Sequence, residues 1–118
     1  MRHGSKNKKF GRVRKVRSGL MRGLAVSFIL HKRIETGEIK AKALRPFIER
    51  LITLEKKGTI AGRRLANSRL GNVAKAEEVL NKIATSDSIA KRSGGYTRIT
   101  KLQRRSSDGA KRAVIEFV

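Results

Sequence analysis

The net charge of the chain constrains its fold and its partners more than any other feature of the sequence. The 118 residues include 30 Lys or Arg and 9 Asp or Glu, which gives a formal net charge of +21 at pH 7. So large a charge on one small body is strongly self-repulsive, and the sequence therefore makes sense beside a large, diffuse negative charge. Nucleic acid is the first candidate for this partner, and an anionic membrane surface is the weaker one.

The positive charge is concentrated at the two ends of the chain. Residues 1–34 contain 11 cations and no acid, residues 35–90 contain 11 cations and 7 acids, and residues 91–118 contain 8 cations and 2 acids. The first 17 residues also have few apolar side chains, so they cannot bury enough surface to offset the entropy of ordering. We therefore expect a basic extension at residues 1–17, extended when free, and one α+β domain at residues 18–118.

Several classes of protein are excluded by what the sequence lacks. It contains no Cys, which excludes a disulfide framework and a Cys-based zinc site. It has no apolar run of about 18 residues that would cross a bilayer. The short apolar stretch at 24–30 has no cleavage site of a signal peptide, so we expect a cytoplasmic protein.

Apolar periodicity predicts four helices in the first three quarters of the chain. We expect them at 19–32, at 41–57, at 60–69 and from 73 to about 83, with N-caps at Ser18, Thr59 and Asn72. The clearest apolar stripe belongs to the second helix, where Pro46 is expected close to the start. A further short helical turn is expected at 88–92.

Strand patterns occupy the rest of the chain. One strand fits between residues 33 and 40, a second covers 96–104, and alternation predicts a third at 113–118. Residues 106–109 form a turn, so the last two strands make a long basic hairpin. The predicted order is helix, strand, three helices and two strands, in an α+β fold.

No group of residues indicates catalysis or metal binding. The two histidines, His3 and His31, have no carboxylate at triad or metal-ligand spacing. Glu77 and Glu78 are adjacent, and neighbouring helical residues do not share a face. We therefore expect neither an enzyme nor a cofactor, metal or small-molecule substrate.

Binding to a polyanion is better supported, because the extension and the hairpin are dense in cations. The α-helical arginines at 63, 64 and 69 fit a contact surface and a merely solvated face about equally well. The candidate RNA-binding residues are Arg2, His3, Lys6, Lys8, Lys9, Arg12, Arg14, Lys15, Arg17, Arg22, Arg63, Arg64, Arg69, Arg92, Arg98, Lys101, Arg104 and Arg105.

The expected mode of binding is contact with phosphates and with the shape of the nucleic acid. Aromatic residues make up 4% of the chain, and most of them are expected in the core, so base stacking is not expected. A free architectural DNA-binding protein and a cationic membrane-active protein stay open as alternatives at this point.

An ordered set of short segments resembles a known family over the whole chain. The segments are Met1–His3, Lys40–Pro46, Leu51–Leu54, Arg63–Ala66, Gly94–Ile99 and Ala113–Val118. Together they resemble the bacterial large-subunit ribosomal protein seventeen family. No single segment is specific alone, but the ordered set is.

The resemblance implies both a fold and a role. It implies a small three-stranded mixed sheet packed on helices. It also implies a structural, non-enzymatic protein that binds large-subunit rRNA near the exit of the polypeptide tunnel, next to neighbouring large-subunit ribosomal proteins.

Overall fold

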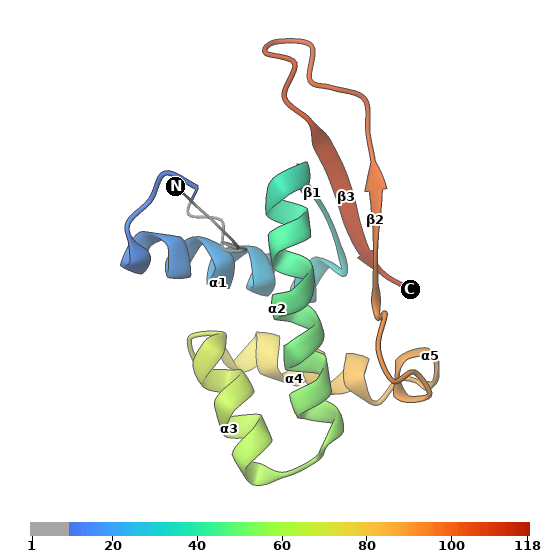
Figure 1. Cartoon of the computed structure of the whole chain (residues 1–118). Coiled ribbons are helices and arrows are strands. Elements are labelled where there is room, and N and C mark those ends of the chain that lie inside the picture. Colours follow the sequence, from blue (N-terminus) through green and yellow to red (C-terminus); the bar gives the residue numbers. More distant parts are fainter. Residues whose placement is uncertain (1–9) are drawn as a thin grey trace, which may run out of the picture.

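The structure, a computed structural model, describes residues 10–118 and contains five helices and three strands (Figure 1). Their order confirms the sequence of elements expected above, with α5 as the short helical turn. The elements are α1 (Arg14–His31), β1 (Arg33–Gly37), α2 (Glu38–Lys56), α3 (Ile60–Arg69), α4 (Ala74–Ala84), α5 (Asp87–Ala90), β2 (Thr97–Lys101) and β3 (Arg112–Phe117).

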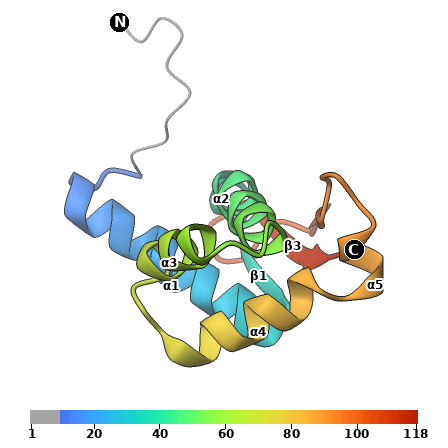
Figure 2. The same cartoon turned by 90° about the horizontal axis from the view of Figure 1, so that it is seen from below.

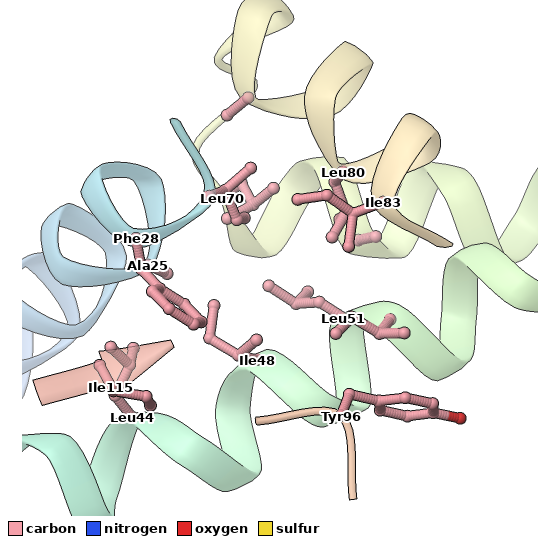
Figure 3. Packing of buried hydrophobic residues seen from close by; sticks show 14 of the residues in the cluster. Ala25, Phe28, Leu44, Ile48, Leu51, Leu70, Leu80, Ile83, Tyr96 and Ile115 are labelled. Carbon is pink, nitrogen blue, oxygen red and sulfur yellow. The ribbon is translucent and has the colours of Figure 1, made fainter. Parts of the chain in front are cut away.

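Helix α2 is the centre of the fold. It contacts α1, α3, α4 and all three strands, and Figures 1 and 2 show these elements arranged around it. Its predicted apolar stripe is confirmed, because Leu44, Ile48 and Leu51 have no exposed surface. Figure 3 shows Phe28 of α1 and side chains from α4 and β3 on either side of this stripe. Each large apolar side chain buried there contributes about 1.5–3 kcal/mol.

Helix α1 begins earlier than expected. It starts at Arg14, five residues before the expected start, and Ser18 lies inside it rather than capping it. Val13 occupies the N-cap position without a side-chain hydrogen bond. Arg and Lys are good helix formers, so the helix that packs on α2 continues back through basic residues that themselves bury little. Residues 14–17 of the expected extension are therefore helical.

The starts of α2 and α4 also differ from expectation. Helix α2 begins at Glu38, so Pro46 is its ninth residue and lies in the helix interior. Because proline has no N–H, the carbonyl of Lys42 lacks its usual helical donor. The N-cap of α4 is Val73, whereas Asn72 takes a left-handed conformation with a φ of 59°.

Helix α3 packs on its neighbours through small residues. The predicted cap is confirmed, since the Thr59 hydroxyl accepts a 3.0 Å hydrogen bond from the Gly62 N–H. Gly62 and Ala66 form the buried face, and a Cβ on Gly62 would lie 2.8 Å from the carbonyl oxygen of Leu54. The larger apolar residues of this helix, Ile60 and Leu65, are instead 70% and 43% exposed.

The sheet is antiparallel throughout, so the expected mixed sheet is wrong. Its strand order is β1-β3-β2, and Ile115 of β3 is paired with Ile34 on one side and Ile99 on the other. The hairpin requires β2 and β3 to be antiparallel, but no local pattern sets the direction of β1 against a strand so distant in sequence. Phe117 stacks on Phe28 at 4.3 Å between ring centroids, which joins the sheet to α1.

Candidate nucleic-acid interface

The N-terminal half of α1 carries a dense group of cations. Arg14, Lys15 and Arg17 lie in its first turn, where there is no acidic residue. The first turn of a helix has a partial positive charge, so cations there are unfavourable unless an anion lies nearby. Figures 1 and 2 show this end of α1 projecting beyond the other helices. The arrangement therefore favours a negatively charged partner.

Cations from α1, α2 and α3 meet around a groove of about 990 Å³, which we call the basic groove. Arg17 and Arg22 of α1 and Arg69 of α3 were predicted from the sequence. The sequence analysis missed Lys42 and Arg50 of α2, which also line the groove. They lie four residues on either side of Pro46, so a common helical face is the signal that would have found them.

The cations of the hairpin are largely paired with acids. Arg98 donates to the Glu116 carboxylate at 2.8 Å, and Lys101 Nζ lies 3.5 Å from a Glu38 oxygen. Arg105 donates to the Asp108 carboxylate at 2.6 Å, and this pair lowers the pKa of Asp108 to about 2. These contacts reduce, but do not remove, the positive charge of the hairpin.

The remaining predicted residues are spread over several elements. Arg64 and Arg104 are exposed and form no ion pair within residues 10–118. The side chain of Arg92 donates to the Ser88 carbonyl at 3.2 Å. Arg12 donates to the Phe10 carbonyl at 2.7 Å. The structure does not describe the five predicted residues Arg2, His3, Lys6, Lys8 and Lys9.

A second cleft, of about 530 Å³, lies between α2, α3 and α4 and is lined by three glutamates. Glu55 and Glu77 line it together with Arg63. Arg63 therefore belongs to this cleft and does not line the basic groove. Glu55 is only 7% exposed, and burial raises its pKa. The positive charge of Arg63 offsets part of this effect, because it favours the ionised carboxylate and so lowers the pKa. Carboxylates repel phosphates, so this cleft is not suited to a nucleic acid.

The described residues give no basis for metal or membrane chemistry. No group of three His, Asp or Glu side chains between residues 10 and 118 is arranged to hold a metal ion. None of the helices in that range is both long and apolar enough to cross a membrane. What the arrangement can do is hold an extended anion along α1 and in the basic groove.

The fold and the charge distribution define a class, the small cationic α+β proteins whose surfaces suit a polyanion. The chain belongs to the ribosomal protein L17 family, because the sequence model of Ribosomal protein L17 matches residues 20–118. The family resemblance noted in the sequence is thereby confirmed, and with it the expectation of a ribosomal protein that is not an enzyme.

Curated relatives support this membership over the full length. The large ribosomal subunit protein bL17 of Persephonella marina is 51% identical over 119 residues, covering 100% of this chain and 95% of that protein. The bL17 protein of Hydrogenobaculum sp. is 49% identical, covering 100% and 99%. The bL17 protein of Methylacidiphilum infernorum is 49% identical, covering 99% and 88%.

Proposed function

We propose that this chain is a structural component of the large ribosomal subunit that binds and stabilises large-subunit rRNA through phosphate and shape contacts. Its position is near the exit of the polypeptide tunnel, with neighbouring large-subunit ribosomal proteins as further partners. It supports translation without catalysing a reaction. Residues 1–17 serve as the basic extension and residues 18–118 as the domain, with α1 crossing the boundary.

The observation that carries the proposal is the group of cations on the first turns of α1. These residues have no acid in their own turn and lie at the positive end of a helix. Phosphates provide the missing negative charge, and Arg in particular forms paired hydrogen bonds with phosphate oxygens. Family membership supports the same partner, since the curated relatives are named as large-subunit proteins.

Fractionation of cells tests the assignment. A tagged copy of the chain should sediment with large ribosomal subunits. Recovery with the nucleoid or with membranes would overturn it. The placement near the tunnel exit is tested by electron microscopy of those subunits, in which density for the chain should border the exit.

The salt dependence of RNA binding tests the phosphate mechanism. If about 8 phosphates are neutralised, the logarithm of the binding constant should fall against the logarithm of salt concentration with a slope of roughly −6 to −7. Deleting residues 1–9 removes four cations and should reduce the slope by about 3. A matched control is Lys75→Gln on α4, an exposed cation that is not among the predicted residues. A slope near zero would contradict phosphate contact.

A further inference from the structure

The basic groove is lined by apolar side chains as well as by cations. Phe10, Met21 of α1, and Ile39 and Phe47 of α2 line it together with the five cations. Ile39 is 57% exposed and Phe47 is only partly buried, so both present apolar surface to the groove. Contacts with phosphates on the outside of a duplex use charged and polar groups, so they would not involve this apolar surface.

The rim of the groove carries one sign of charge. Its cations come from three different helices, and no acid lines the groove. Lys42 Nζ has a partner, since it lies 3.0 Å from a Glu38 oxygen, but no ion pair within residues 10–118 involves Arg17, Arg22, Arg50 or Arg69. A volume of about 990 Å³ is at the upper end of the range for small-molecule sites. The groove therefore has room for part of a chain molecule with regularly spaced negative charges.

Two backbone features add to the chemistry of the groove. Pro46 lines it, and because proline has no N–H, the Lys42 carbonyl lacks its usual helical donor. Phe10 has a φ of 54°, which is rare for a bulky residue, and Gly11 follows with a φ of 62°. Strained backbone of this kind is typical of sites where a ligand is held.

We propose that the basic groove binds unpaired nucleotides of the rRNA, with phosphates on the arginine rim and a base against Phe47 and Ile39. Unstacked bases are the part of RNA that combines an apolar face with polar edges and adjacent phosphates. The proposal rests on the proposed function and deepens it. It differs from the expectation from composition, in which base stacking takes no part in binding.

Cross-linking in the assembled subunit identifies the occupant directly. A photoreactive phenylalanine analogue is placed at position 39 in the groove, and a matched one at position 60 on α3, where the isoleucine is 70% exposed and does not line the groove. Position 39 should cross-link to rRNA at one short unpaired segment. If the chain enters large subunits but position 39 yields an adduct with a protein, a duplex segment or nothing, the groove assignment is overturned. Failure to enter subunits would instead overturn the proposed function.

Binding of short oligonucleotides separates the base from the phosphates. A ten-nucleotide single strand carrying 2-aminopurine should show quenched fluorescence on binding, and an abasic strand of the same length should bind more weakly. Phe47→Leu keeps an apolar side chain but removes the aromatic ring, and it should weaken binding to the base-containing strand by about fivefold to tenfold. Ile39→Ser should also weaken it, whereas the control Ile60→Ser should not.

The same variants are measured with an A-form duplex of equal length. None of them should change duplex affinity, because duplex binding uses phosphates alone. Equal binding of the base-containing and abasic strands, or equal effects of Ile39→Ser and Ile60→Ser, would overturn the nucleotide site while leaving phosphate binding intact. Thermal unfolding of each variant shows whether it is folded.

Discussion

Replacing Tyr96 should show how the last strands are anchored to the helices. The ring is 2% exposed and packs beside α2, with its hydroxyl at the edge of the core (Figure 3). Lys56, near the end of α2, donates to this hydroxyl at 3.1 Å, and the hydroxyl donates to the Arg92 carbonyl at 3.3 Å. One side chain thus joins α2, the segment after α5 and the start of β2.

The contributions of the Tyr96 ring and of its hydroxyl to stability can be estimated separately. Tyr96→Ala removes a large buried ring, and such truncations cost about 3–5 kcal/mol. Tyr96→Phe keeps the ring and its cation–π contact, in which Lys56 Nζ lies 4.9 Å from the ring centroid. It loses only the hydroxyl, which makes two hydrogen bonds worth about 1 kcal/mol each. Because Lys56 also donates directly to the Arg92 carbonyl, part of the link between these segments survives.

Thermal unfolding followed by circular dichroism measures Tm for both variants, and urea unfolding measures the loss of free energy. At this chain length, about 1 kcal/mol corresponds to roughly 4 °C in Tm, so Tyr96→Ala should lower Tm by more than 10 °C and Tyr96→Phe by roughly 4–8 °C. Lys56→Met removes the ammonium group and serves as a control, and its loss of stability should be similar to that of Tyr96→Phe. A loss below about 1.5 kcal/mol for Tyr96→Ala, or equal losses for Ala and Phe, would refute the anchoring argument.

Other positions test local geometry and charge. Gly62→Ala should destabilise the fold by about 1–3 kcal/mol in urea unfolding, because the new Cβ would meet the backbone of α2. Gly23→Ala on α1 places its Cβ in open space and should stabilise the fold by about 0.5–1 kcal/mol. Equal effects of the two substitutions would contradict the packing of α3. Burial raises the pKa of Glu55, so the folded state holds that proton more tightly, and stability should fall as pH rises from 4.5 through the raised pKa. Glu55→Gln should therefore raise Tm at pH 7 and flatten this pH dependence, and an unchanged pH profile would contradict the argument. Carbon NMR should find the pKa of Asp108 at about 2, and Arg105→Gln should move it toward 3.8; no movement would mean that the pair is not formed in solution.

Features set by neighbouring residues were predictable from the sequence. The stripe of α2 gave its buried face, because helical periodicity determines which side chains share a face. Thr59 as the cap of α3 was predictable, since a Thr side chain before a helix satisfies a free N–H. The alternation at the end of the chain predicted a strand, and β3 occupies Arg112–Phe117.

Features that depend on distant contacts were not predictable. The direction of β1 depends on how α2 and the sheet pack, and no pattern within five residues encodes it. The buried face of α3 consists of Gly62 and Ala66, and the sequence does not reveal it because such small residues carry little hydrophobic signal. The shared helical face of Lys42 and Arg50 could be found from their spacing, but the basic groove itself could not, because they join Arg22 only when three helices meet.

The positions of the acids explain which cations remain for a polyanion. Four of the hairpin and sheet cations, Arg98, Lys101, Arg105 and Arg112, each face a carboxylate within 3.5 Å. Exposed pairs of this kind stabilise a fold by at most about 1 kcal/mol, so their main effect is to reduce repulsion while the sheet forms. The first turns of α1 have no such acids. The acids therefore offset much of the charge of the sheet, whereas the cations in the first turn of α1 and four of the five cations of the basic groove form no ion pair within residues 10–118. This unpaired charge is the part that the proposed contact with rRNA would neutralise.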